Sequence, residues 1–304
     1  MKTNSLFLFF LLSLFIVSCD SGNNFDDLVK KEEQANEGND GGGNGDEGNG
    51  DPVVRNDSIE LTLTNYGKTV KFNMRKVESG SFSMGDKDNG PVHRVTLTRT
   101  YYMGETEVTQ AQWETVMGSL PTGIAKYADD YPVYNMSWNN CASFVYKLNE
   151  LTKNSRRDSM KFYIPTEAEW EFAARGGNKT KGYKYSGSDT YSEVAVIGPN
   201  TSSSYDAIWI ENVKQKKGNE LDIFDMTGNV WEWCSDWHYY LYPSEAQIDP
   251  IGPDTGDYKV IRGGGTDTYP IRYTTYRGKA SYRDYIPYNS SGDYGRIGLR
   301  ILLK

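Results

Sequence analysis

The chain has 304 residues and a net charge of −8 at neutral pH, with 37% hydrophobic and 13% aromatic residues. An acidic chain of this kind offers no basic face to nucleic acid, so we expect no nucleic-acid partner. Residues 57–304 are enough to bury one large hydrophobic core, and their length also allows two.

The first residues predict export. An apolar run from Leu6 to Val17 follows Lys2 and ends at Ser18 and Cys19. The run is too short to span a bilayer easily, which is typical of a signal peptide covering residues 1–18. The sequence "LFIVSC" resembles a bacterial lipobox, which implies cleavage before Cys19 and attachment of lipid to that residue. The alternative is a short anchor helix retained in the mature chain.

Residues 19–56 consist largely of Gly, Asn, Asp and Glu, as in "NEGNDGGGNGDEGNGD". They carry no periodic apolar signal and cannot bury enough surface to fold. We expect a disordered, acidic, Gly-rich tether between the lipid and a folded domain at 57–304.

The folded part begins with strands. The stretches 58–85 and 93–104 alternate apolar and polar residues and break at glycines, which predicts strands joined by turns. After Gly177 the chain is rich in glycine and aromatic residues, and we expect no convincing helix there, with the tryptophans and tyrosines packed by loops.

Three helices are predicted between these regions. Thr109 and Gln112 form a capping box ahead of residues 110–117, and Gly118 supplies the stop. Ser137 precedes a helix with apolar residues on one face. Thr166 and Glu169 form a second capping box. The fold class is therefore α+β, a single compact domain poor in regular secondary structure.

Two cysteines remain after Cys19. Cys141 lies in the second predicted helix and Cys234 follows "VWEW". They could form one disulfide in an oxidising envelope, or they could be two buried free thiols. The residues alone leave both alternatives open.

Several motifs resemble one family when taken in chain order. They are "GSFSMG", "GETEVTQAQWETVMG", "PVYNMSWNNCASFVYKLN", "IPTEAEWEFAARGG", "DMTGNVWEWCSDW", "RGGG" and "GRIGLR". Their order is similar to that of the formylglycine-generating enzyme, or sulfatase-modifying factor, family over about residues 70–302. The resemblance implies a fold related to the C-type lectin fold.

Active members of that family oxidise a sulfatase cysteine with oxygen, using Cu(I) held by two cysteines. The resemblance places those cysteines at Thr268 and Tyr273, and the serine before them at Gly265. Cu(I) prefers soft thiolate ligands, so neither side chain can hold it and copper is not expected. Relatives that use iron need three histidines, and this chain has only His93 and His238.

The resemblance also implies a structural calcium ion. Its ligands would be Asp225, the carbonyl oxygens of Gly228 and Val230, and Glu232, a set of hard oxygen donors in a tight loop. The alternative is that Asp225 and Glu232 cap turns or pair with Arg262.

The segment from Thr266 to Arg296 is unusually rich in tyrosine. Tyrosine supplies rigid contact area at low entropic cost, and small polar residues supply adaptable hydrogen bonds, as in antibody paratopes. The segment predicts a ligand-binding surface for a protein or glycan. Its candidate residues are Thr266, Asp267, Thr268, Tyr269, Tyr273, Tyr276, Tyr282, Tyr285 and Tyr288.

The same segment resembles that of the variable proteins of diversity-generating retroelements, which use this fold and rewrite a C-terminal ligand-binding segment within a fixed frame. Here the frame would be Arg262, Gly263, Gly264, Arg272, Arg277, Gly298 and Arg300.

Three functions follow from these features. The first is a non-catalytic, lipid-anchored display protein that binds a ligand through its Tyr-rich segment. The second is a structural envelope lipoprotein of a gliding or secretion complex, and the third is an oxidase acting on protein cysteine. We expect the cell envelope of a Gram-negative bacterium, at the outer membrane or the cell surface.

Overall fold

The computed structural model describes residues 52–55, 57–88, 90–156, 160–196, 209–265, 272–290 and 296–304, except for the side chains of 272–274. All of them lie within Gly45–Lys304, one of the two units into which the chain divides. The predicted signal peptide, Cys19 and residues 20–51 of the predicted tether lie outside the described residues. Within the described ranges, no helix is long and apolar enough to cross a membrane.

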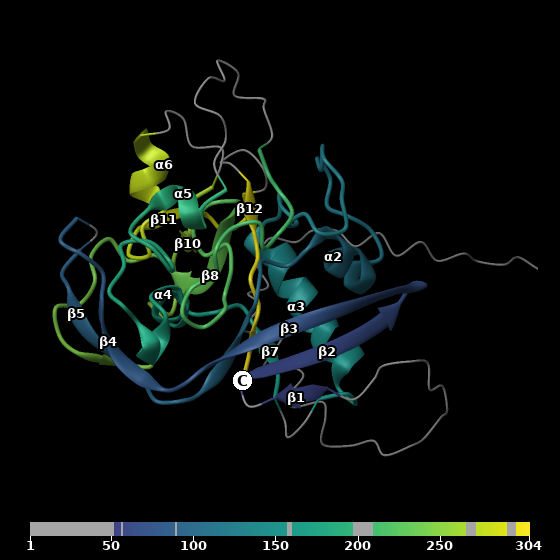
Figure 1. The fold of residues 1–304 in the computed structure, drawn as a ribbon, viewed down its shortest axis with the longest axis horizontal. Coiled ribbons are helices and arrows are strands. Elements are labelled where there is room, and N and C mark those ends of the chain that lie inside the picture. Colours follow the sequence, from purple (N-terminus) through teal and green to yellow (C-terminus); the bar gives the residue numbers. More distant parts are fainter. Residues whose placement is uncertain are drawn as a thin grey trace, which may run out of the picture. The chain divides into compact units, whose positions relative to one another are not determined.

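A six-stranded sheet joins five strands from the first half of the domain to β13, the last strand of the chain (Figure 1). Its strand order is β1-β2-β3-β6-β13-β7. The strands are β1 (Val53–Arg55), β2 (Ser58–Asn65), β3 (Lys68–Val77), β6 (Tyr101–Gly104), β13 (Leu302–Leu303) and β7 (Phe162–Tyr163). Strand β1 pairs with β2, so regular structure starts before the predicted boundary at residue 57.

Two smaller sheets complete the domain. A four-stranded sheet has the order β11-β10-β8-β12, and a three-stranded sheet has the order β4-β5-β9. Their strands are β11 (Arg283–Pro287), β10 (Tyr258–Arg262), β8 (Trp231–Trp237), β12 (Ile297–Gly298), β4 (Gly80–Met84), β5 (His93–Leu97) and β9 (Gln247–Ile248). Figure 1 shows β12 beside β8, with the chain then running to its C-terminus.

The three predicted helices are confirmed. They are α2 (Gln110–Met117), α3 (Trp138–Thr152) and α4 (Glu167–Ala174). Thr109, Ser137 and Thr166 each accept a hydrogen bond from the backbone N–H three residues on, and each helix has a complete capping box. Gly118 ends α2 in the left-handed conformation, with φ 89°. Local side-chain chemistry therefore sets where these helices start.

Two expectations for the region after Gly177 were wrong. Short helices form there, namely α5 (Tyr191–Val194), α6 (Arg272–Arg277) and the 3₁₀ turn η1 (Gly177–Lys179). The tryptophans are also not packed by loops alone, because Trp231, Trp233 and Trp237 all lie on β8. A strand that is covered on both faces can carry large aromatic residues at any position, and β8 is such a strand.

The hydrophobic core joins the sheets to helix α4. One buried cluster contains Val77 of β3, Trp170 of α4, Cys234 of β8, Val260 of β10 and Leu302 of β13. Every residue of α4 is buried, so this helix lies inside the domain rather than on its surface. The predicted α+β class is confirmed by this mixture of small sheets and few helices.

Candidate functional site

A buried arginine at the end of β10 holds the C-terminal segment to the core. Arg262 has no exposed surface and pairs with Glu171, and its Nε lies 3.3 Å from Oε1 of Glu167. It also donates to the carbonyl oxygens of Tyr282 (2.5 Å) and Ala280 (3.4 Å). Burial opposes the charged form, but the nearby Glu171 outweighs it and holds the pKa of Arg262 above its usual range.

The glycines after Arg262 bring α6 against β10. Gly263 and Gly264 both have positive φ, at 91° and 74°. A Cβ on Gly264 would lie 3.1 Å from the carbonyl oxygen of Arg277, which is tighter than ordinary packing allows. Only glycine fits such a backbone and such an approach. The predicted frame therefore corresponds here to a close contact between a turn and the end of a helix.

A second buried arginine fixes the end of the frame. Arg300 and Glu232 are both fully buried, and Arg300 donates from Nη2 to Oε1 (2.7 Å) and from Nε to Oε2 (3.0 Å) of Glu232. Glu232 also accepts from Nε1 of Trp170 at 2.6 Å. Gly298 pairs with Glu232 in the parallel β12–β8 ladder.

The structure describes only part of the segment to which the resemblance assigns the copper positions. Thr268 lies outside the described residues, as do Thr266, Asp267 and Tyr269. Tyr273 lies in α6, and its side chain is outside the described set.

Neither described cysteine has the character of a reactive thiolate. Cys141 and Cys234 are both free and buried, which decides between the two alternatives left open by the sequence. Burial raises the pKa of each thiol. Both side chains therefore stay protonated at neutral pH and pack as small apolar groups.

The predicted calcium ligands lie in one buried loop and strand. Asp225 accepts a hydrogen bond from the backbone N–H of Lys214 through Oδ2, at 2.7 Å, whereas its Oδ1 is buried without a partner. Burial raises the pKa of Asp225 to about 6. Both oxygens of Glu232 are bonded to Arg300 or Trp170. A calcium ion could use Asp225 Oδ1 directly, but it would need Glu232 to release an oxygen.

No group of three or more His, Cys, Asp or Glu side chains suited to a metal occurs in the part of the chain that the structure describes. The predicted calcium set contains only two such side chains, so this finding does not decide it, and the calcium site stays a prediction. The alternative pairing of Glu232 with Arg262 does not form. These two residues are opposite each other in the β8–β10 ladder, yet Glu232 pairs with Arg300 and Arg262 pairs with Glu171.

Three exposed tyrosines and one half-buried histidine form a group of rings centred on Tyr285, and we call it the aromatic face. It consists of His238, Tyr240, Tyr258 and Tyr285. The His238 ring stacks on Tyr285 with a centroid distance of 3.8 Å, and Tyr258 meets Tyr285 edge-on at 5.3 Å. Tyr240 is 82% exposed, Tyr258 40% and Tyr285 37%.

The histidine of the aromatic face carries no charge at neutral pH. Partial burial, together with the nearby Arg283, lowers the pKa of His238 to about 4, so its imidazole is neutral and acts as a flat stacking surface. Three tyrosine hydroxyls provide polar tips on an otherwise apolar group of rings. Such a surface suits a partner that combines apolar area with hydrogen-bonding groups.

The other predicted tyrosines are less available than the sequence suggested. Tyr276 and Tyr282 are partly buried and contact each other edge-on, with ring centroids 5.1 Å apart. Burial, then the charge of Asp284, raises the pKa of Tyr282 to about 12. Tyr288 is partly buried and contacts Trp237 edge-on at 5.4 Å. Of the predicted tyrosines whose side chains are described, Tyr285 alone is exposed.

Sequence reasoning missed three members of the aromatic face. His238 and Tyr240 follow β8 and Tyr258 begins β10, so all three lie outside the segment singled out by its composition. The only local signal was the run of aromatic residues from Trp237 to Tyr240. The register of β10 with β11 sets the spacing of Tyr258 and Tyr285. Val260 lies opposite Tyr285 in this ladder, and Tyr258 is two residues before Val260 on the same strand.

Residues 66–301 match the model of the sulfatase-modifying factor enzyme 1-like domain. The chain belongs to this family. The fold is shared with Treponema denticola variable protein 1, at a TM-score of 0.64 and 26% identity, covering 80% of this chain and 98% of that one. PvdO from Pseudomonas aeruginosa has the same fold at a TM-score of 0.58 and 21% identity. The predicted C-type-lectin-like domain is thereby confirmed.

Two curated relatives show how the family similarity is distributed. The chaperone protein LppX of Paenibacillus barcinonensis is 32% identical over 246 residues, which cover 68% of this chain and 83% of that protein. The formylglycine-generating enzyme of Streptomyces coelicolor is 32% identical over 182 residues, covering 55% of this chain. The match spans about half of that enzyme, 51% of its length.

Proposed function

We propose that this protein is a non-catalytic ligand-binding member of the family, and that the aromatic face is its binding surface for a protein or glycan. The observation that carries the proposal is the group of rings around Tyr285, whose three tyrosines are exposed. The rings of His238, Tyr240 and Tyr258 each contact Tyr285. Rings joined in this way form a rigid apolar surface that gains contact area without losing much side-chain entropy on binding.

The similarity to a variable protein supports the ligand-binding part of this proposal. Treponema denticola variable protein 1 matches this chain over 98% of its own length. We propose that the segment Thr266–Arg296 is the part of this chain that varies in sequence. It lies within the frame whose residues Arg262, Gly264 and Arg300 are held in the core. Two buried arginines would let that segment change while the fold is kept.

The absence of catalysis rests on residue chemistry. Threonine and tyrosine stand at the two copper positions, and neither is a Cu(I) ligand. The two other cysteines are buried, protonated thiols. The proposal includes no oxidase step.

We place the protein in the cell envelope of a Gram-negative bacterium, at the outer membrane or the cell surface, attached through a lipid on Cys19. The lipobox-like "LFIVSC" and the acidic, Gly-rich residues 20–51 support this proposal. A tether of this composition would let a display domain reach partners at some distance from the membrane.

The test is a binding screen with a matched control. The full chain is applied to glycan and peptide arrays, and its hits are measured again with the triple variant Tyr240→Ala/Tyr258→Ala/Tyr285→Ala. We expect the variant to lose binding at least about tenfold, since buried aromatic contacts dominate interfaces. Tyr127→Ala removes another exposed tyrosine, 55% exposed and far along the chain from this face, and should keep binding.

Two results would refute the proposal. The triple variant could bind as well as the wild type while remaining folded by circular dichroism. Alternatively, the wild type could consume oxygen in the presence of copper and a cysteine-containing peptide, which would favour the oxidase. The relative named a chaperone protein favours the peptide array as the first to be screened.

A further inference from the structure

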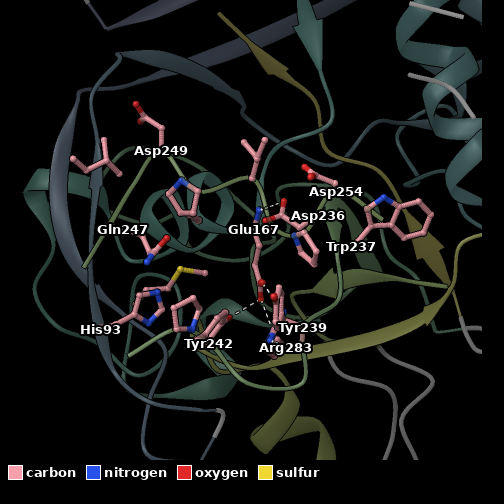
Figure 2. A pocket seen from close by; sticks show the side chains of 18 residues that line it. His93, Glu167, Asp236, Trp237, Tyr239, Tyr242, Gln247, Asp249, Asp254 and Arg283 are labelled. Atoms are coloured by element: carbon pink, nitrogen blue, oxygen red, sulfur yellow. Dashed lines mark hydrogen bonds and ion pairs between the residues drawn. The ribbon is translucent and has the colours of Figure 1, made fainter. Parts of the chain in front are cut away.

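A cavity of about 560 Å³ opens beside α4, β8 and β11 (Figure 2). This volume is in the usual range for small-ligand pockets. None of the four residues of the aromatic face lines the cavity, so the two surfaces can be tested separately. Three features of the lining, its charge, its rings and one buried carboxyl, point to the same ligand chemistry.

The lining is negatively charged overall. Its carboxylates are Glu167, Asp236, Asp249 and Asp254, whereas Arg283 is its one Lys or Arg side chain. Arg283 is already engaged, since it donates to both oxygens of Glu167 at 2.8 Å. No ion pair to Asp236, Asp249 or Asp254 forms within the described ranges. The cavity therefore holds more negative charge than its own cation neutralises.

Among these carboxylates, Glu167 has its negative charge balanced by neighbouring arginines. Burial acts to raise its pKa, but Arg283 and Arg262 outweigh burial and hold the pKa below its usual value. The hydroxyl of Tyr242 donates to it as well, at 2.7 Å. Figure 2 shows these contacts converging on Glu167, with Asp236 beside it. Both carboxylate oxygens of Glu167 therefore already accept hydrogen bonds from this chain, so we do not expect Glu167 to be the charge partner of a ligand.

Asp236, in contrast, has no lysine or arginine paired with it in the described part of the chain. It is only 5% exposed. Its Oδ2 accepts from the backbone N–H of Glu167 (2.9 Å) and from the Ser235 hydroxyl (3.2 Å), whereas no described residue donates to Oδ1. Burial and then the charge of Glu167 raise the pKa of Asp236 to about 7. A cation beside Oδ1 would supply the charge partner that this carboxyl lacks.

The rest of the lining suits an aliphatic stem that carries the cation. Ile248 and Ile251 are 71% and 67% exposed, and both line the cavity together with three prolines. The ring of Tyr239 is 53% exposed at the cavity. Tyrosine rings attract cations over their faces. The cavity lining already contains one such contact, because Arg283 lies 4.3 Å from the Tyr242 ring centroid.

We propose that this cavity binds the lysine or arginine side chain of a peptide ligand, with Asp236 as its charge partner and Tyr239, Ile248 and Ile251 around its stem. The ligand is a peptide because a single basic side chain fills only part of the volume, and the flanking peptide can occupy the remainder. Asp254 lies at the exposed rim and attracts the same charge.

Binding should become tighter as pH rises from 6 to 8. The titratable groups that share the cavity with Asp236 are Glu167 on α4, Arg283 on β11, His93 on β5, Asp249 and Asp254 after β9, and the phenols of Tyr239 and Tyr242. Glu167 is held ionised by its arginines, and hydrogen bonds from Thr98 keep the pKa of Asp249 low against burial. Ionisation of Asp236 falls in this interval, because its pKa is raised to about 7.

The experiment uses three probes on the full chain at pH 8, and binding is measured by calorimetry. They are N-acetyl-arginine methylamide, N-acetyl-lysine methylamide and the neutral N-acetyl-norleucine methylamide. We expect the two cationic probes to bind about tenfold tighter than norleucine. Asp236→Asn should remove most of this preference, and Asp257→Asn, an exposed carboxylate that does not line the cavity, should leave it unchanged.

Equal binding of the norleucine probe would overturn the proposal, as would an unchanged preference in a folded Asp236→Asn protein. If Asp236→Asn does not fold, Asp254→Asn at the exposed rim decides instead. It should weaken the cationic probes about twofold to threefold, and no weakening would overturn the proposal. Tyr285→Ala should not affect these probes, so failure here is distinguishable from failure of the aromatic face.

Discussion

The Arg300–Glu232 pair offers the most direct test of how the C-terminal frame is held. Both side chains are fully buried, and Arg300 also donates to the carbonyl oxygens of Gly104 and Phe224, each at 2.9 Å. Arg300→Met keeps much of the side-chain volume but leaves the Glu232 carboxylate without its charge partner. Breaking a buried ion pair in this way costs about 3–5 kcal/mol.

This loss should be visible in thermal unfolding. For a domain of this size, 1 kcal/mol corresponds to roughly 2–4 °C in Tm, so Arg300→Met should lower Tm on the order of 10 °C. Arg94→Met is the matched control, because Arg94 is exposed on β5 and has no ion pair among the described residues. Its Tm should stay within about 2 °C of the wild type, as for most surface substitutions.

A double-mutant cycle separates the ion pair from simple loss of packing. Glu232→Gln combined with Arg300→Met removes both charges, so the double variant should be less destabilised than the sum of the two single variants. Additive effects of the two substitutions would refute the reasoning. So would an Arg300→Met protein within about 1 kcal/mol of the wild type.

Two further predictions concern the buried carboxyls. If the loop of Asp225 holds calcium, EDTA should lower Tm, calcium should restore it, and Asp225→Asn should abolish the response; an EDTA-insensitive Tm would contradict the site. The raised pKa of Asp236, about 7 against 3.8, means that the folded state binds more protons than the unfolded state between about pH 4 and 7, so this group lowers stability as pH rises. Urea unfolding of Asp236→Asn should therefore show a larger gain over wild type at pH 8 than at pH 4, and an equal difference at both pH values would contradict the shift.

The sequence itself determined the elements whose signals are local. The capping boxes at Thr109 and Thr166 each need only two residues three positions apart, so the start of each helix is encoded within one turn. Strands β2 and β3 follow from alternation broken by Gly67, which has φ 70°. The family motifs are also linear, which is why the fold class and the family could be predicted together.

Long-range pairing decided what local patterns could not. No local rule indicates that Glu232 pairs with Arg300 rather than with its ladder neighbour Arg262, because both arginines are equally charged and the choice depends on where the chain returns. Helix α6 was missed for a related reason. A six-residue helix has little stability of its own and depends on contacts such as that between Gly264 and Arg277.

The candidate binding surfaces depend on the tertiary structure in the same way. Composition located Tyr285, but its stacking partner His238 follows β8 and its neighbour Tyr258 begins β10, two strands that only the four-stranded sheet brings together with β11. The cavity likewise collects Glu167, Asp236 and Arg283 from α4, β8 and β11. The sequence determined the chemical groups that were available, and packing over long separations decided which of them meet and which lose their water.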